Sequence, residues 1–213
     1  MKYLMLLYFF CFANIFLSAQ NISEDLLVFV GKKIAITKQG SPSVSVDTFI
    51  TKKDTVFILK IKFQKYKATY KIEKIYCGDY SSDTISFFTY SDEPIIPILS
   101  KYENIMLFLY KENDVYYHKK KLFFDVYQTK KGEWASDYSY EDYNRPDSKT
   151  FTVKPEKIKF KNKLSYVISN YKEEYIKKHF PSPYYIIKKN KAIAVYGNYA
   201  PELVNLKMQG ILK

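Results

Sequence analysis

The sequence has little cysteine, arginine, histidine or glycine, and each shortage excludes a class of chemistry. Its 213 residues include two cysteines, two histidines and six glycines, and Arg145 is the only arginine. No histidine or cysteine pair has zinc-site spacing, and no G-x-S-x-G motif, phosphate-binding glycine loop or dinucleotide motif is present. We therefore expect neither a cofactor nor a metal, and we favour a protein that is not an enzyme.

The N-terminus, "MKYLMLLYFFCFANIFLSAQ", has the pattern of a secretory signal peptide. One early lysine, Lys2, precedes a long uncharged apolar run that ends in small residues. We predict that residues 1–19 are a leader cleaved between Ala19 and Gln20, which would leave an exported protein, periplasmic or extracellular. The alternative is an uncleaved membrane anchor, because the apolar run approaches the roughly 20 residues that span a bilayer.

Cleavage would remove Cys11 and leave Cys77 as the single cysteine. The exported chain would then form no intrachain disulfide, and its stability would depend on burying apolar surface. Cys77 ends the alternating stretch "KATYKIEKIYC", in phase with Ile75, and unpaired cysteine is usually a buried apolar residue. We favour a packing role for Cys77. A Cys–His dyad and an intermolecular disulfide remain as alternatives.

The net charge of +12 comes almost entirely from lysine. Lysine is a flexible point charge, whereas arginine supplies the planar fork that reads bases, so we expect no specific nucleic-acid readout. We interpret the charge as a solvated basic surface. Lysine-mediated binding of a polyanion is the alternative, and it would weaken steeply as salt rises.

Apolar residues alternate with a period of two from residue 25 to about 127, which is typical of strands. A bulge is expected at Gly31 and another where the apolar phase shifts at Glu73 and Lys74. Five or more curved antiparallel strands in about 100 residues favour a small OB-like barrel. We assign residues 20–130 to this barrel domain.

The rest of the chain is predicted to be an α+β extension over residues 151–213, packed on the barrel. Residues 161–180, "KNKLSYVISNYKEEYIKKHF", show helical spacing and predict one amphipathic helix. A short hairpin is expected around the turn at Lys189 and Asn190. The fold class is therefore mainly β with a C-terminal α+β extension.

Residues 131–150 are predicted to form an aromatic and acidic loop between the two parts. Exposed aromatic loops can bind sugars or proteins, so four residues are candidate binding residues: Trp134, Tyr138, Tyr140 and Tyr143. The alternative is that Trp134 folds back to cap the barrel while the acidic residues face solvent. The carboxylates lack the spacing of a calcium loop, so we favour no calcium site.

A second candidate surface is the lysine-rich stretch "VYYHKKK", which could form a positive rim. Its candidate binding residues are His118, Lys119, Lys120 and Lys121.

Three stretches resemble the OB-fold domains of the netrin-module and tissue-inhibitor-of-metalloproteinases type. They are "LLVFVGKKIAI", "ATYKIEKIYCGDYSSDTISFFTY" and "YENIMLFLYKE", within residues 24–115. The resemblance implies a barrel and a binding role. Animal inhibitors of this family chelate the protease zinc through an N-terminal cysteine. The mature start predicted here is "QNISEDL", so that mechanism and the family's disulfides are not carried over.

Together these features predict an exported, non-enzymatic binding protein that contacts another protein or an anionic polymer of the cell envelope. We expect contact with a membrane only if the leader stays uncleaved. A secreted hydrolase is the rival hypothesis. It requires a concave pocket that joins Cys77 or a pair of carboxylates to a histidine.

Overall fold

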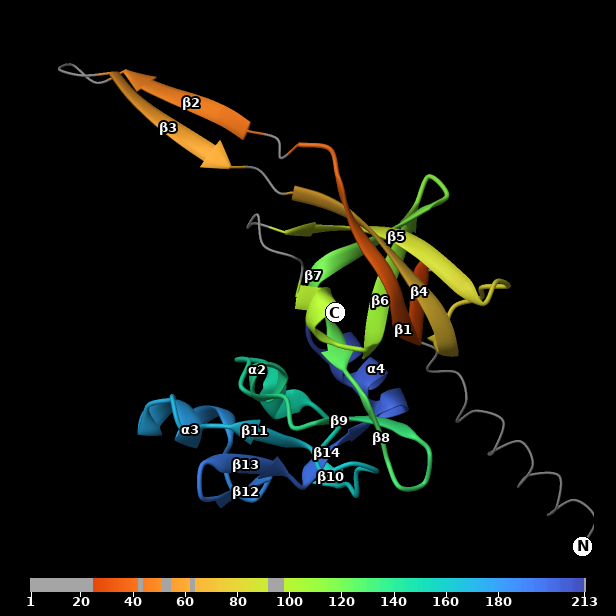
Figure 1. Cartoon of the computed structure of the whole chain (residues 1–213), viewed down its shortest axis with the longest axis vertical. Helices are drawn as coiled ribbons and strands as arrows, with labels where there is room; N and C mark the ends of the chain where they lie inside the picture. The colour runs from red at the N-terminus through yellow and green to blue at the C-terminus, as the bar shows by residue number, and fades with distance from the viewer. Residues whose placement is uncertain (1–24, 42–43, 51–54, 62–63, 92–97, 213) are drawn as a thin grey trace, which may run out of the picture.

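The computed structural model describes residues 25–41, 44–50, 55–61, 64–91 and 98–212. The predicted leader, with Cys11, lies outside these residues. Figure 1 shows an N-terminal β-barrel, a hairpin that extends away from it, and a C-terminal lobe at the opposite end. The helix α4 lies between the barrel and the strands of the lobe.

Five strands close the barrel in the order β1-β4-β5-β7-β6. β1 closes the ring by pairing antiparallel with both β4 and β6, and only the β5–β7 pair is parallel. The mainly β fold with a small curved barrel is therefore confirmed. The barrel strands are β1 (Leu26–Gln39), β4 (Gln64–Cys77), β5 (Thr84–Ser91), β6 (Asn104–Glu112) and β7 (Val115–Asp125).

Residues 26–31 of β1 and 105–109 of β6 are buried on both faces, which explains their continuous apolar runs. In "LLVFV", Leu27 and Phe29 point into the barrel, whereas Val28 packs outward among residues of β6, β7 and α4. In "IMLFL", Leu107 and Phe108 divide between the same two clusters. A run without alternation thus indicates a second layer outside the barrel wall.

The expected bulges are present and curve the barrel wall. The β1–β4 register shifts between Val30 and Gly31, and it skips Glu73 on β4. A Cβ on Gly31 would lie 2.6 Å from the Phe29 ring and 3.0 Å from the Lys71 carbonyl oxygen, so this close approach requires glycine. A further shift in the β6–β7 pairing places Lys121 at a φ of 72°.

A hairpin, β2 (Val44–Ile50) and β3 (Thr55–Ile61), is inserted between β1 and β4. The two strands pair antiparallel from Val44 opposite Ile61 to Ile50 opposite Thr55. In Figure 1 this hairpin points away from the C-terminal lobe.

The C-terminal lobe holds two small sheets and three helices. One sheet has the order β10-β14-β9-β8 and the other the order β11-β13-β12. The strands are β8 (Tyr127–Gln128), β9 (Trp134–Asp137), β10 (Glu156–Lys157), β11 (Ser165–Val167), β12 (Tyr185–Lys188), β13 (Lys191–Ala194) and β14 (Tyr196–Tyr199). The helices are α2 (Tyr140–Tyr143), α3 (Glu173–His179) and α4 (Ala200–Gln209), and the short 3-10 turns are η1 (Ile98–Lys101) and η2 (Ser148–Thr150).

Two predictions for this part of the chain were wrong. Residues 161–180 do not form one helix, because Ser165–Val167 pairs with β13 and the helix α3 covers only Glu173–His179. Residues 131–150 are not an irregular loop, because they contain β9, α2 and η2. In both cases pairing with distant strands decides the local structure over intrinsic propensity. The hairpin around Lys189 and Asn190 is confirmed as β12–β13.

Helix α4 joins the lobe to the barrel. Ala200, Leu203 and Leu206 are almost fully buried in the cluster that covers the outward face of β1 and β6. The helix begins at a strong start signal, because the Glu202 carboxylate accepts a hydrogen bond from the Tyr199 backbone N–H at 3.0 Å. Within the described residues, no helix is long and apolar enough to cross a membrane.

Candidate ligand-binding cleft

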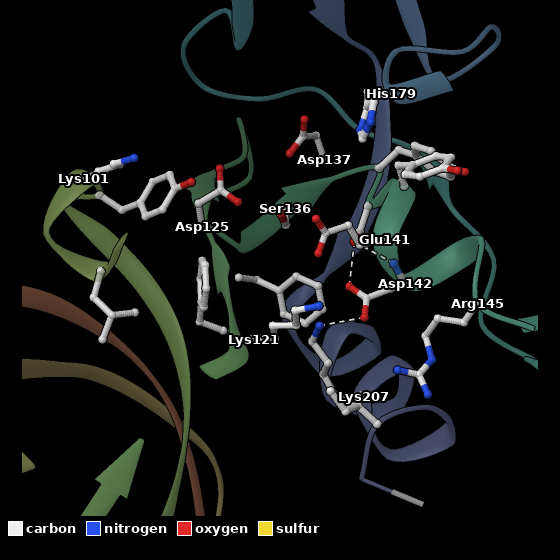
Figure 2. Close-up of a pocket in the computed structure, with 18 of the residues that line it drawn as sticks. Lys101, Lys121, Asp125, Ser136, Asp137, Glu141, Asp142, Arg145, His179 and Lys207 are labelled. Atoms are coloured by element: carbon white, nitrogen blue, oxygen red, sulfur yellow. Dashed lines mark hydrogen bonds and ion pairs between the residues drawn. The ribbon is translucent and has the colours of Figure 1, made fainter. Parts of the chain in front are cut away.

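A cleft of about 880 Å³ lies between the barrel and the C-terminal lobe. The barrel contributes residues of β5, η1 and β7, and the lobe contributes residues of β9, α2, α3, β12 and α4. Figure 2 shows charged side chains of both signs on its wall: Lys101, Lys121, Asp125, Asp137, Glu141, Asp142, Arg145 and Lys207. The cleft therefore offers hydrogen-bond donors and acceptors together, without one dominant charge.

The two candidate surfaces predicted from the sequence meet in this cleft. Four of their eight residues line it: Tyr138, Tyr140, His118 and Lys121. Lys119 is exposed, with its Nζ 4.4 Å from the centre of the Tyr110 ring. The side chain of Lys120 lies outside the described residues. Trp134 is half-buried against the cluster between barrel and α4, as the capping alternative predicted.

His118 is a buried residue rather than part of a positive rim. It is 5 % exposed, its Nδ1 lies 3.2 Å from the Thr89 hydroxyl, and its Nε2 lies 3.2 Å from the Leu122 carbonyl oxygen. Burial lowers the pKa of His118 to about 4, so the ring is neutral at pH 7. The irregularity in β7 brings the Leu122 carbonyl oxygen within hydrogen-bond distance of the ring.

Tyrosines form much of the lobe side of the cleft. Tyr138 is stacked between Tyr143 and Tyr184, with ring centres 5.4 and 4.0 Å away. The Tyr143 hydroxyl donates a hydrogen bond to Asn198 Oδ1 at 2.8 Å, so this residue is held by the lobe. The half-buried Tyr143 and buried Tyr138 thus serve packing more than exposed contact.

An aromatic row leads from the surface into the cleft. The Tyr171 ring, just before α3, stacks on Tyr175 of α3 at 4.6 Å, and Tyr175 stacks on His179 at 4.0 Å. His179 in turn lies 4.6 Å from Tyr140 on α2. Tyr171 and Tyr175 are 47 % and 41 % exposed, so this row presents ring edges and hydroxyl groups to a ligand.

Two carboxylates, Asp125 and Asp137, lie on the wall where the chain leaves the barrel (Figure 2). Asp125 accepts a hydrogen bond from the Tyr127 hydroxyl at 2.8 Å, and Asp137 accepts one from the Tyr185 hydroxyl at 2.6 Å. Burial, and then the charge of Asp125, raise the pKa of Asp137 to about 7. Burial also raises the pKa of Asp125. The pair therefore holds a proton near neutral pH.

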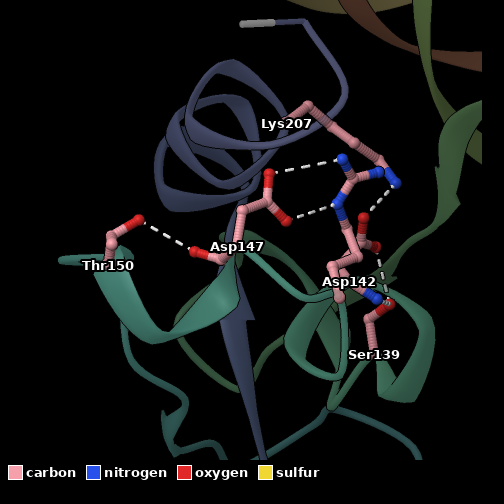
Figure 3. A network of polar contacts seen from close by, with 6 residues as sticks. Ser139, Asp142, Asp147, Thr150 and Lys207 are labelled. Carbon is pink, nitrogen blue, oxygen red and sulfur yellow. Dashed lines mark hydrogen bonds and ion pairs between the residues drawn. The ribbon is translucent and has the colours of Figure 1, made fainter.

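A buried ion pair closes the floor of the cleft and joins α4 to α2 (Figure 3). Lys207 Nζ lies 2.6 Å from Asp142 Oδ1 and 4.3 Å from the centre of the Phe124 ring on β7. The Ser139 hydroxyl donates a hydrogen bond to Asp142 Oδ2 at 2.6 Å. The prediction that the acidic residues of 131–150 face solvent is thus wrong for Asp137 and Asp142, which are both 7 % exposed.

Cys77 does not belong to the cleft. It is half-buried against the cluster between barrel and α4, and its thiol lies 3.9 Å from the Leu26 carbonyl oxygen. Burial raises its pKa, which disfavours the reactive thiolate. Both ring nitrogens of His118 face other partners and His179 lies in the aromatic row, so neither forms a dyad with Cys77.

Several cleft residues escaped the sequence analysis because no motif joins them. Asp125 and Tyr102 come from the barrel, and Asp137, Tyr185 and Lys207 come from three different elements of the lobe, β9, β12 and α4. The usable signals were indirect. "FFD" and "WASD" each end an apolar stretch in a carboxylate, and Lys207 lies one helical turn from the apolar Leu203.

No three side chains of His, Cys, Asp or Glu in the described part of the chain are grouped to hold a metal ion. Comparisons of the chain with protein-family models, curated proteins and solved structures found no match. The function is therefore argued from the cleft itself.

Proposed function

We propose that the protein is an exported, non-enzymatic binding protein whose ligand site is the cleft between the barrel and the C-terminal lobe. The main support is that residues of the barrel and of the C-terminal lobe line one concave site. They include the candidates Tyr138, Tyr140 and Lys121. Export rests on the predicted leader. The resemblance to netrin-module domains is compatible with a binding role and remains a hypothesis.

The ligand that this cleft fits best is a hydroxyl-rich polymer of the cell envelope. Tyrosine hydroxyls, carboxylates and lysines lie beside aromatic rings, so a chain with many hydroxyl groups would find both donors and acceptors. The aromatic row from Tyr171 to Tyr140 extends the site beyond the cleft. A protein segment is the other ligand class that tyrosine-lined clefts accept.

The test is sedimentation of the mature chain with insoluble envelope polysaccharide, compared with a matched variant. Tyr140→Ala/Tyr175→Ala removes two cleft rings, and Tyr80→Ala removes a barrel tyrosine that does not line the cleft. We expect the double variant to bind about tenfold or more weakly and Tyr80→Ala to bind like the parent. Unchanged binding by the double variant would place the ligand elsewhere, and capture of peptides alone would favour a protein ligand.

A second candidate function is acid–base hydrolysis by Asp125 and Asp137, because two carboxylates with raised pKa values line the same cleft. In this reaction the protonated member would donate its proton to the leaving oxygen, and the ionised member would activate water. Asp137→Asn would then abolish release of reducing ends from a bound polysaccharide while leaving sedimentation unchanged. Absence of any turnover by the parent chain would reject this candidate.

A further inference from the structure

The sheet β11-β13-β12 has one covered face and one open face, and the register shows which residues lie on each. Val167 is opposite Lys191, which is opposite Lys188, and the next row on the same face holds Ser165, Ile193 and Ile186. The row between them, Tyr166, Ala192 and Ile187, points to the other face. Tyr166 and Ala192 pack in the core of the lobe on that face, whereas Ile187, on the edge strand β12, is 46 % exposed.

The open face combines aliphatic side chains with lysines. Val167 is 58 % exposed and Ile186 is 47 % exposed, and Lys188 and Lys191 beside them are exposed as well. Lys189, in the turn that joins β12 and β13, is also exposed. No aspartate or glutamate occurs in the three strands. An apolar strip therefore lies beside uncompensated positive charge.

The surroundings of this face are basic too. Residues 151–200 contain eleven lysines, three glutamates and no aspartate, and all eleven lysines are exposed. This fifty-residue stretch therefore carries most of the chain's net charge of +12. A second copy of the chain on the open face would bring lysines against lysines, so self-association is disfavoured.

We propose that the open face, defined as Val167, Ile186, Ile193, Lys188 and Lys191, docks on the surface of a membrane that contains anionic lipid. Aliphatic side chains would enter the boundary between headgroups and acyl chains, and the lysines would contact the lipid phosphates. A soluble polyanion would satisfy the lysines but would leave Val167 and Ile186 in water. The lipid surface is the partner that matches both kinds of side chain.

This docking orients the cleft. Tyr185 lines the cleft and lies on the covered side of the same sheet, because it is 5 % exposed and pairs with the buried Ala194 of β13. A chain docked through its open face would hold the cleft away from the lipid surface. The membrane face and the ligand cleft are thus separate surfaces, and substitutions can weaken binding at one without changing binding at the other.

The experiment is vesicle co-sedimentation with the mature chain recovered after export. One vesicle preparation is phosphatidylcholine alone and the other contains about 30 % phosphatidylglycerol, both in about 0.1 M salt. Val167→Ser/Ile186→Ser removes the aliphatic strip, and Lys188→Gln/Lys191→Gln removes charge. The matched controls on the barrel are Ile34→Ser, which changes a side chain 57 % exposed, and Lys38→Gln/Lys67→Gln.

We expect the parent to sediment with the anionic vesicles only. The aliphatic variant should bind about tenfold more weakly, and the lysine variant should bind more weakly with a flatter salt dependence. Both controls should match the parent, and circular dichroism should show that every variant is folded. Equal binding by parent and aliphatic variant would overturn the proposal. Absence of binding to anionic vesicles would also overturn the proposal. So would binding to heparin that is as tight as binding to vesicles and is unchanged in the aliphatic variant.

Discussion

In the barrel, β1 and β6 bury apolar residues on both faces, whereas the sheet β11-β13-β12 buries only one. The runs differ in size, because "LLVFV" and "IMLFL" each hold five large apolar side chains, whereas "KAIA" holds one lysine and two alanines. Helix α4 supplies the second layer for the barrel wall, and Leu203 in this layer is fully buried. In the lobe, Val167 and Ile186 remain exposed on the other face. A covered second face contributes stability, while an open one is available for contact.

Loss of the ion pair that holds α4 should have the largest effect on this second layer of the barrel wall. Lys207→Ala would leave the Asp142 carboxylate buried without its partner, and we expect a loss of about 3–5 kcal/mol in the free energy of unfolding. Urea denaturation measures this loss. In the double variant Asp142→Asn/Lys207→Met most of the loss should be recovered, since no unpaired charge remains. Equal instability of the single and double variants would contradict the ion-pair explanation.

The next largest effect is expected in the apolar cluster between α4 and the outward face of β1 and β6. Leu203→Ala should cost about 2–5 kcal/mol, because Leu203 is fully buried between the lobe and the outward face of β1 and β6. Trp134, the only tryptophan, packs against this cluster and reports on it by fluorescence. We expect its urea transition to coincide with that of circular dichroism, in the parent and in the variant. Separate transitions would show that barrel and lobe unfold independently.

The barrel could be predicted from the sequence and much of the lobe could not. The period of two is local in stretches such as "KATYKI" of β4, whereas "LLVFV" and "IMLFL" are short apolar runs bounded by polar residues or glycine, which also fit strands. In contrast, the apolar residues of 161–180 fit a helix, yet Val167 lies in a strand and Tyr171 is exposed, because β13 pairs with β11. The helix α4 was missed although Pro201 and Glu202 mark its start.

The site was the least predictable part. Tyr140 and Lys121 were proposed for separate surfaces, and only the packing of α2 beside the barrel brings them into one cleft. The pairing of Asp125 with Asp137 depends on where two strands end, which no local pattern encodes. Residue types therefore indicate candidate binding residues, but tertiary contacts determine which of them lie together in one site.

The two regions should also respond to pH in opposite directions. Burial raises the pKa of Asp137 to about 7, so its contribution to stability is present below pH 4 and is lost as pH rises toward 7. Burial lowers the pKa of His118 to about 4, so its contribution is present above pH 6.5 and is lost as pH falls toward 4. Between pH 4 and 6.5, a rise in pH therefore lowers the stability contributed by Asp137 and raises the stability contributed by His118.

The variant Asp137→Asn separates the two contributions to the pH dependence of stability, because only that of His118 remains. The amide keeps an acceptor for the Tyr185 hydroxyl and carries no charge, so we expect about 1–3 kcal/mol more stability at pH 8 than in the parent. Between pH 6.5 and 4 the variant should lose stability more steeply than the parent, because the opposing carboxylate is gone. Chemical denaturation at several pH values measures both effects. A variant with the parent's pH profile would show that Asp137 is ionised in the folded protein.

A smaller effect is expected at Cys77. Cys77→Ala removes a half-buried thiol with one long contact to Leu26, so we expect a loss of about 1 kcal/mol and unchanged ligand binding. The native thiol should react with a thiol reagent far more slowly than the unfolded one, since burial raises its pKa. Rapid labelling of the native protein, or a disulfide-linked dimer, would contradict the packing role and indicate that Cys77 is a functional thiol.

The smallest loss of stability is expected at a strand face that is open to solvent. Ile186→Ser and Met106→Ser make the same kind of change on the outward face of a strand, but Ile186 is 47 % exposed and Met106 is fully buried beneath α4. We expect Ile186→Ser to change stability by less than about 0.5 kcal/mol and Met106→Ser to cost several times more, as measured by urea denaturation. A large loss at Ile186 would mean that another part of the chain covers the open face, and that face would then have no room for a membrane.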